Sequence, residues 1–180
     1  INIKFTKEDI DFLRNKNMFD EGFLEYLENF KFKGDVYAFK EGSVIFPHEP
    51  VITVRANIIE AQIIETMTLL QFNHQSLIAT KANRIVTSAN GRAVMEFGAR
   101  RAHGVSASIN GARAAYIAGC VGTSNTILGK MYDISVLGTM AHSYVQSFDS
   151  ELEAFKAYCR TFPDNATLLV DSYDTLKSGV

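Results

Sequence analysis

The sequence predicts an α/β fold: an α+β N-terminal part followed by the first strands and helices of an incomplete, irregular, TIM-like barrel. Three observations predict it. Helix and strand patterns alternate through the second half, which favours a parallel sheet with right-handed crossovers. Two short apolar runs there break directly into polar loops, as buried parallel strands do at their C-terminal ends. With 180 residues the chain is shorter than the roughly 250 of a complete eight-stranded barrel, so we expect a fragment of a larger enzyme.

Residues 1–91 are predicted to form part of an N-terminal α/β domain with its linking helices. A capping-box pattern from Thr6 to Asp9 begins a short helix, and Asp20 caps a second one. The remaining elements follow from strand and helix periodicities. They are a hairpin of residues 34–39 and 43–46 around Glu41-Gly42, a strand over 51–55, and helices over 57–72 and 75–88.

Residues 92–180 are predicted to form the first part of a barrel-like domain, in which strands, loops and helices repeat. Apolar runs predict the strands and amphipathic or small-residue segments predict the helices. The expected strands are 93–97, 134–137 and 167–170, and the expected helices are 107–118, 125–132 and 151–160.

Composition narrows the classes of function. A net charge of −2 provides no dominant basic face, which argues against nucleic acid as a partner. The two cysteines, Cys120 and Cys159, are far apart in sequence, so neither a disulfide framework nor a thiolate metal cluster is expected. No apolar run is long enough to cross a bilayer, and no signal peptide is evident. We therefore expect a cytoplasmic protein with no membrane partner.

Two strand ends carry the residues best suited to chemistry. The run 134–137 opens into Gly-Thr-Met-Ala-His-Ser, which presents His142 beside two hydroxyl groups, Thr139 and Ser143. The strand over 93–97 is followed by Arg100-Arg101, a pair of fixed positive charges. A titratable nucleophile at one strand end and guanidinium groups at another predict an anionic substrate.

Several motifs together resemble those of nicotinate phosphoribosyltransferases, type II phosphoribosyltransferases, in the same order and at compatible spacing. The similarity covers nearly the whole chain. The motifs are Asn73–Lys81, Met95-Glu96-Phe97-Gly98-Ala99-Arg100-Arg101-Ala102, Gly111–Ile117, Gly122-Thr123-Ser124-Asn125, Gly138-Thr139-Met140-Ala141-His142-Ser143 and Leu168–Thr175.

This resemblance implies an enzyme of NAD salvage that makes nicotinate mononucleotide and pyrophosphate from nicotinate and phosphoribosyl pyrophosphate. It implies ATP hydrolysis coupled through a phosphohistidine at His142, with Mg²⁺ in the reaction and a homodimer as a possible assembly. Thr139 would contact nicotinate, and Arg100 would bind the carboxylate or phosphate of a substrate. By itself, the 180-residue chain is expected to be inactive.

Other candidate residues keep two interpretations each. Arg113 is either a phosphate ligand or an ion-pair partner within its helix, and Gly122–Asn125 is either a phosphate cradle or a helix cap. Asp171 and Asp174, at the end of the last predicted strand, are candidates for Mg²⁺ or phosphate binding or for a partner to the histidine.

Two other functions stay open at this point. One is a nicotinamide- or quinolinate-specific relative. The arginine pair and Ser143 favour nicotinate over nicotinamide, because an anionic ring substituent requires a cation. The other is a non-catalytic α/β fragment that binds a phosphorylated metabolite.

Overall fold

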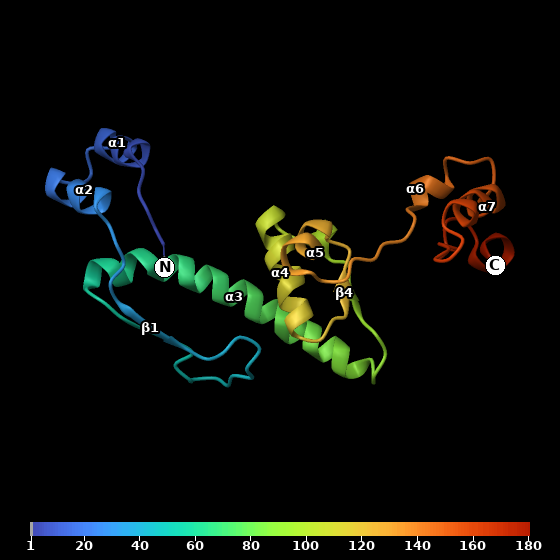
Figure 1. Cartoon of the computed structure of the whole chain (residues 1–180), viewed down its shortest axis with the longest axis horizontal. Coiled ribbons are helices and arrows are strands. Elements are labelled where there is room, and N and C mark those ends of the chain that lie inside the picture. Colours follow the sequence, from blue (N-terminus) through green and yellow to red (C-terminus); the bar gives the residue numbers. More distant parts are fainter. Residues whose placement is uncertain (1) are drawn as a thin grey trace. The chain divides into compact units, whose positions relative to one another are not determined.

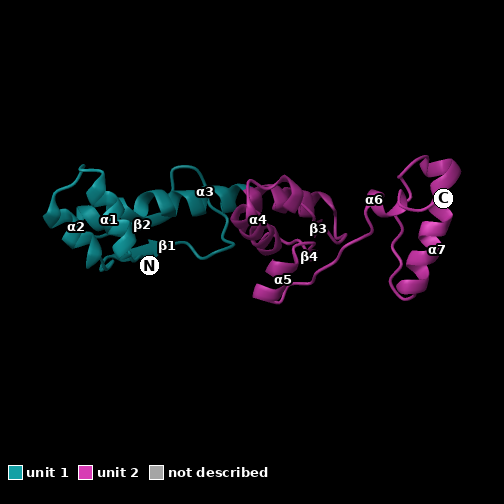
Figure 2. Ribbon diagram, turned by 90° about the horizontal axis from the view of Figure 1, so that it is seen from above, with its two compact units in different colours: residues 1–77 teal, residues 78–180 magenta. Residues whose placement is uncertain are grey.

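The computed structural model describes residues 2–180, and the chain divides into two compact units, residues 1–77 and 78–180 (Figures 1 and 2). This division falls inside one helix, α3 (Ile58–Ser88). The predicted assignment of residues 1–91 and 92–180 to two domains stays a prediction.

Two short helices begin unit 1. Helix α1 (Lys7–Asn15) starts with the predicted capping box, in which Thr6 and Asp9 satisfy each other's main-chain amides. Helix α2 (Glu21–Glu28) starts with Asp20, whose carboxylate accepts from the amide of Phe23 at 2.8 Å. The apolar faces of both helices meet in one cluster, whose buried members are Ile10, Leu24 and Leu27.

The hairpin prediction was wrong in its pairing. Strand β1 (Asp35–Ala38) pairs antiparallel with β2 (Ile52–Arg55), and residues 43–46 form no strand. Val44 and Phe46 are 79% and 64% exposed, because no layer covers them. Ile52 and Val54 instead alternate with exposed neighbours and border a groove beside α3, so burial selects β2 as the partner.

The prediction of two helices over 57–72 and 75–88 was also wrong, since α3 runs without a break. The predicted interruption lay at Asn73 and His74. In the structure the Gln75 amide nitrogen bonds back to the carbonyl of Gln71 at 3.3 Å, and the Ser76 hydroxyl bonds to that of Asn73 at 3.3 Å. No glycine or proline occurs among these residues. The Gln75 and Ser76 side chains therefore bond to carbonyls of their own helix, and the helix continues.

After the C-terminal part of α3, unit 2 has the predicted alternation of strand and helix. Its elements are β3 (Met95–Glu96), the short helix η1 (Ala99–Arg101), α4 (Val105–Ile117), β4 (Gly122–Thr123) and α5 (Thr126–Tyr132). The strands are parallel, as predicted, with Met95 opposite Gly122, and Val136 continues the pattern through a parallel bridge to Thr123. Small residues on α4 allow close packing, and Ala112, Leu128 and Ile134 form one buried cluster.

The rest of unit 2 consists of α6 (His142–Val145), α7 (Glu151–Thr161) and η2 (Thr175–Gly179). Residues 134–137 and 167–170 form no regular strand, contrary to prediction, apart from the bridge at Val136. Leu169 and Val170 pack against the cluster of Met140, Val145, Ala154 and Phe155, so side-chain burial holds this segment where no strand partner does. The α/β class is confirmed, and the barrel stays a prediction.

Candidate active site

Unit 2 brings the C-terminal ends of two short strands and one bridge residue to one edge. β3, β4 and the residue Val136 are parallel neighbours, so the loops that follow them begin on the same side. The loop after β3 carries the arginine pair, and the segment after Val136 leads through Thr139 to His142. The arginine pair therefore follows one of these ends directly, whereas His142 comes six residues after Val136, on α6.

Glu96 joins two of these loops through its carboxylate. One oxygen accepts from the main-chain amide of Gly98, at the start of η1, and the other accepts from the Thr123 hydroxyl at 2.7 Å. Thr123 is fully buried, and its hydroxyl oxygen accepts in turn from the amide of Asn125 at 3.0 Å. The turn with the arginines and the loop after β4 are therefore held together by one side chain. Sequence reasoning missed this role, although an acidic residue directly at a strand end was a visible signal.

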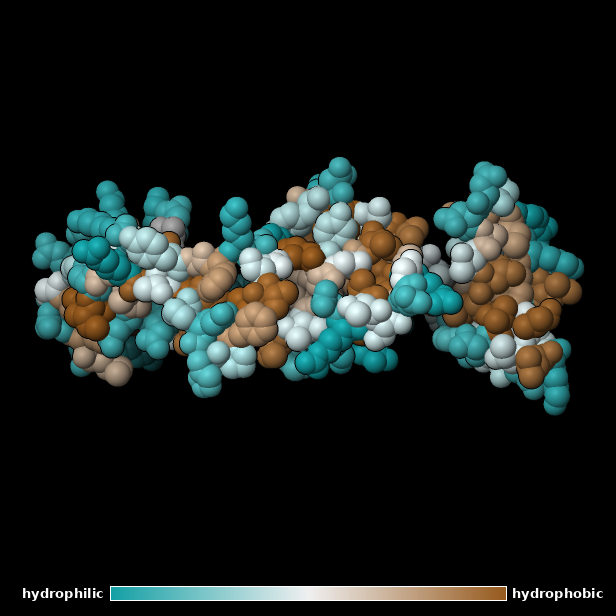
Figure 3. All heavy atoms as spheres, turned by 90° about the horizontal axis from the view of Figure 1, so that it is seen from below, coloured by the Kyte–Doolittle hydropathy of each residue, from teal (hydrophilic) through white to brown (hydrophobic). Residues whose placement is uncertain are grey.

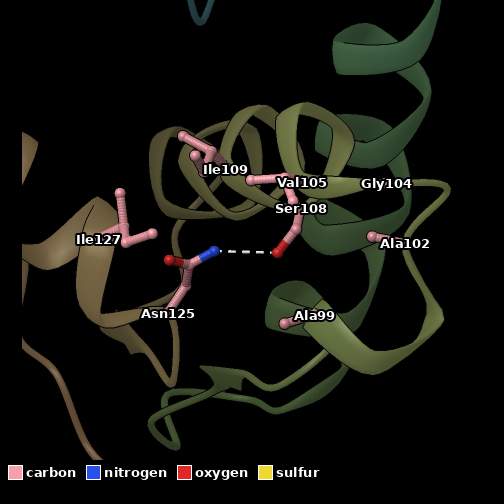
Figure 4. Close-up of a pocket in the computed structure, with 8 residues that line it drawn as sticks. All are labelled: Ala99, Ala102, Gly104, Val105, Ser108, Ile109, Asn125 and Ile127. Carbon is pink, nitrogen blue, oxygen red and sulfur yellow. Dashed lines mark hydrogen bonds between the residues drawn. The ribbon is translucent and has the colours of Figure 1, made fainter.

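Asn125 completes the network at the start of α5. Its Oδ1 accepts from the amide of Leu128 at 3.2 Å, which confirms the helix-cap interpretation of Gly122–Asn125. Its Nδ2 donates to the Ser108 hydroxyl of α4 at 2.9 Å (Figure 4). The two side chains border a largely apolar pocket of about 370 Å³, lined by Ala99, Ala102, Gly104, Val105, Ser108, Ile109, Asn125 and Ile127.

The arginine pair lies beside this pocket without lining it. Arg100 and Arg101 belong to η1, both are exposed, and neither forms an ion pair within residues 2–180. Arg113 lies on α4, where its guanidinium carbon is 5.3 Å from the centre of the Tyr132 ring. The predicted substrate-binding roles of these three arginines stay predictions.

His142 has two neighbours on one loop. Its Nδ1 is 3.1 Å from the hydroxyl oxygen of Ser172, and its Nε2 is 3.7 Å from Oδ1 of Asp171. The side chains of His142 and Asp171 are both about half exposed, at 52% and 60%. The structure thus brings together two residues that the sequence singled out, and adds Ser172, which sequence reasoning quoted in a motif but gave no role.

Asp174 has a different task in the structure. Its Oδ1 accepts from the amides of Leu176 and Lys177 at 3.2 and 3.1 Å, and its Oδ2 lies 3.7 Å from the Lys177 ammonium. It is therefore the N-cap of η2. Of the two candidate aspartates, Asp171 is the one beside the histidine.

The remaining candidates are less constrained. The exposed Thr139 donates its hydroxyl to the carbonyl of Met140 at 3.2 Å, and Ser143 is exposed on α6 next to His142. No hydrogen bond or ion pair in the described part of the chain joins Arg100 or Arg101 to the His142 group, so a common pocket stays a prediction.

Comparisons with known proteins identify the family. The sequence profile of the nicotinate phosphoribosyltransferase (NAPRTase) N-terminal domain matches residues 1–73. A nicotinate phosphoribosyltransferase of Mycobacterium tuberculosis is 50% identical over 174 residues, which are 97% of this chain and 37% of that protein. The enzyme of the same name from Bacillus subtilis is 46% identical over 179 residues, 99% of this chain and 36% of that protein. The chain belongs to the nicotinate phosphoribosyltransferase family.

Solved structures agree with this membership. The crystal structure of human nicotinic acid phosphoribosyltransferase matches with a TM-score of 0.88 and 26% identity, over 98% of this chain and 45% of the human one. A nicotinate-nucleotide pyrophosphorylase from Pyrococcus furiosus matches with a TM-score of 0.69 and 30% identity, over 79% of this chain and 37% of its own. This member of the family thus spans a little over a third of the length of the curated nicotinate phosphoribosyltransferases it matches, at 37% and 36%.

Proposed function

We propose that the whole protein is a nicotinate phosphoribosyltransferase, which makes nicotinate mononucleotide and pyrophosphate from nicotinate and phosphoribosyl pyrophosphate. Similarity to enzymes of that name over nearly the whole chain supports the proposal. The observation that carries the proposal is the contact group of His142, Asp171 and Ser172, in which an imidazole lies between a carboxylate and a hydroxyl. Such a group suits an enzyme whose substrates carry phosphoryl groups, because an imidazole nitrogen can accept a phosphoryl group.

Positive charge is the first requirement of this reaction. When the bond at the anomeric carbon breaks, the sugar becomes oxocarbenium-like and the departing pyrophosphate gains negative charge. Fixed guanidinium groups lower that barrier, because their charge is in place before the bond breaks. We assign this task to Arg100 and Arg101, whose exposed side chains have no competing carboxylate in the described chain, and to Arg113. Thr139 and Ser143 would orient nicotinate through their hydroxyl groups.

His142 would couple ATP hydrolysis to the transfer. In this step the γ-phosphorus of ATP forms a bond to an imidazole nitrogen while its bond to the bridging oxygen breaks, and ADP leaves. The phosphorylated ring keeps a proton on its other nitrogen and carries positive charge. Asp171, 3.7 Å from Nε2, would stabilise that charge.

The proposed reaction also requires Mg²⁺, bound to the phosphate groups of the substrates. No cluster of three or more metal-binding side chains occurs within residues 2–180, and Asp174 is occupied as a helix cap. A single exposed carboxylate is still enough for the usual Mg²⁺ mode, in which one carboxylate and several substrate oxygens and waters bind the ion. Asp171 would be that carboxylate, and the ion would supply charge neutralisation at the phosphates.

The cellular setting is also part of the proposal. We infer a cytoplasmic enzyme of the NAD salvage route, acting as a homodimer. No helix in the described chain is both long and apolar enough to cross a membrane.

The test is an assay of the intact protein with nicotinate, phosphoribosyl pyrophosphate, Mg²⁺ and ATP. We expect nicotinate mononucleotide and pyrophosphate in equal amounts, with ATP consumed. Product with nicotinamide or quinolinate and none with nicotinate would reject the proposal in favour of a relative with a different ring specificity.

Two variants test the assigned roles. His142→Ala should abolish ATP hydrolysis linked to product, because no phosphoryl acceptor remains. Arg100→Ala should raise the KM for an anionic substrate on the order of tenfold or more, since a charge-assisted contact is lost. Unchanged ATP consumption per product in His142→Ala would reject the phosphohistidine.

A further inference from the structure

Glu96 bridges Gly98 and Thr123 through its carboxylate, and both oxygens of that group are used. Oε1 accepts from the amide of Gly98, and Oε2 accepts from the hydroxyl of Thr123 at 2.7 Å. The main chain of Glu96 is fixed as well, because this residue belongs to β3 and its carbonyl accepts from the amide of Ser124 at 3.0 Å. The carboxylate therefore has a defined position before any substrate binds.

The turn that carries the arginine pair is held by this carboxylate through Gly98. Gly98 is the N-cap of η1: its amide donates to Glu96, and its carbonyl accepts from the amide of Arg101 at 2.9 Å. The orientation of Arg100 and Arg101 thus depends on where the carboxylate lies. Neither guanidinium forms an ion pair within residues 2–180. Glu96 therefore fixes the turn through the main chain and leaves both guanidinium groups to a ligand.

The glycine at position 98 is required by the carboxylate and not by the backbone. Its φ of −83° lies outside the left-handed region that favours glycine. A Cβ at this position would lie 2.8 Å from Oε1 of Glu96, which is closer than real Cβ atoms approach another atom. Any side chain at position 98 would therefore push the carboxylate away from its two donors.

The other end of the Glu96 bridge is buried. Thr123 is fully buried, and its hydroxyl oxygen accepts from the amide of Asn125, the cap of α5. A hydroxyl at such a place has no water to replace a lost acceptor. Thr123 is thus the fixed end of the bridge, and the exposed turn with the arginines is the part that the bridge positions.

We propose that Glu96 is a positioning residue for the phosphoribosyl transfer: it holds the η1 turn so that Arg100 and Arg101 face the pyrophosphate before that group departs. This inference rests on the proposed function. In the step, the anomeric carbon bonds to the ring nitrogen of nicotinate while its bond to the pyrophosphate oxygen breaks. The electron pair of the broken bond leaves with pyrophosphate, and guanidinium groups already in place stabilise it without the cost of reorientation.

Two substitutions in the intact protein disturb the bridge in different ways. Glu96→Gln keeps the shape, but an amide has only one acceptor oxygen, so one of the two contacts is lost. Gly98→Ala leaves the carboxylate charged and displaces it. The matched control is Glu60→Gln in unit 1, because Glu60 is 4% exposed and its carboxylate also accepts two hydrogen bonds, from the Lys33 amide at 2.7 Å and from the Asn57 side chain. Circular dichroism checks that each variant is folded.

The first measurement is kcat/KM for phosphoribosyl pyrophosphate. We expect Glu96→Gln and Gly98→Ala each to lower it on the order of tenfold to a hundredfold, as for a misplaced group that stabilises the transition state. Glu60→Gln should match the unchanged protein. The direction is informative, because Glu96→Gln removes a negative charge and would favour anionic substrates if charge were its only role. An unchanged or higher kcat/KM in either of the two variants would overturn the inference.

The second measurement shows whether Glu96 acts through the arginines. In the double variant Arg100→Ala and Arg101→Ala, the groups that the bridge positions are absent, so adding Glu96→Gln should lower kcat/KM by no more than about twofold further. Radiolabelled nicotinate keeps such slow turnover measurable. A further loss as large as that in the unchanged background would overturn the inference. Failure of the unchanged protein to form nicotinate mononucleotide would instead overturn the proposed function.

Discussion

At the scale of single residues, the thiols of Cys120 and Cys159 differ in burial, and we expect them to differ in reactivity. Burial raises the pKa of the Cys120 thiol, and the nearby negative charge of Glu96 adds to the rise. Cys120 is 6% exposed, whereas Cys159 on α7 is half-buried. A higher pKa leaves less thiolate at any pH below it, and the thiolate is the reactive form.

We therefore expect iodoacetamide at pH 8 to alkylate Cys159 well before Cys120. Mass spectrometry of tryptic peptides over time measures this order. Cys120→Ser should leave the fast phase intact and Cys159→Ser should remove it. A fast phase that survives in Cys159→Ser would contradict the burial of Cys120.

Thr123 tests the network around Glu96. Thr123→Val keeps the shape but leaves one Glu96 oxygen and the amide of Asn125 without their bonds at 2.7 and 3.0 Å. We expect a loss of about 1–3 kcal/mol in the free energy of unfolding, measured by urea denaturation. Thr126→Val, an exposed position on α5, is the control and should change it little. Equal effects of the two substitutions would show that the network contributes nothing.

At the scale of elements, local sequence signals predicted the helix caps but not the continuity of α3. Thr6 and Asp20 cap their helices as predicted, and Asn125 follows the helix-cap interpretation, one of the two left open, because a cap is a contact between near neighbours in sequence. The break near Asn73 and the strand over 43–46 were wrong, because the choice depends on what lies across from those residues in space. Strand 134–137 was reduced to one bridge for the same reason.

His74→Pro distinguishes the continuous helix from the predicted pair. Proline removes a main-chain donor inside α3 and clashes with the preceding turn, which costs about 3 kcal/mol or more. A helix boundary at this point would tolerate it. We expect a large loss of stability and of helical circular dichroism, with His74→Ala close to the unchanged chain. Similar unfolding curves for both variants would favour two helices.

The site shows the same division between what sequence patterns reveal and what they do not. Residue types at strand ends singled out His142 and Asp171, and the structure places them within 3.7 Å. Ser172 and Glu96 were missed, because a serine or a glutamate acquires its role from a partner 30 or 27 residues away. Contacts between residues so far apart in sequence cannot be predicted from their spacing.

At the scale of the whole molecule, many large apolar side chains remain exposed within each unit. They include Ile58 at 71% and Leu69 at 49% in unit 1, and Leu152 at 59% and Leu176 at 86% in unit 2. Figure 3 shows hydrophobic surface gathered on one face of the C-terminal part. Surfaces of this kind are interaction sites or aggregation hazards.

The 180-residue chain, made by itself, is therefore expected to bind the dye ANS and to associate as its concentration rises. Sedimentation velocity over a range of concentrations measures the association, and added sulfate should strengthen it, because this ion is excluded from the protein surface and so favours apolar burial. A single monomeric species at every concentration, without dye binding, would contradict this expectation.

Buried charge adds to this picture. Glu151 is 5% exposed, and neither of its carboxylate oxygens has a hydrogen-bond partner within the described chain. Because an isolated buried carboxylate is unfavourable, Glu151→Gln should not destabilise the 180-residue chain and should raise its melting temperature. Differential scanning calorimetry checks this, and a lower melting temperature would mean that the carboxylate has a partner after all.

The Glu96 bridge makes neighbouring loops mechanically dependent. A molecule that reorients the segment with Arg100 would also shift the Glu96 carboxylate, which accepts from the amide of Gly98 and from the Thr123 hydroxyl. That shift would reach Asn125, whose amide donates to the Thr123 hydroxyl. If two reactants occupy this edge, the affinity for each should then depend on whether the other is present, and to the same degree in both directions. Severing the bridge by Thr123→Val should make the two affinities independent, and titration calorimetry of each reactant with and without the other would measure that loss.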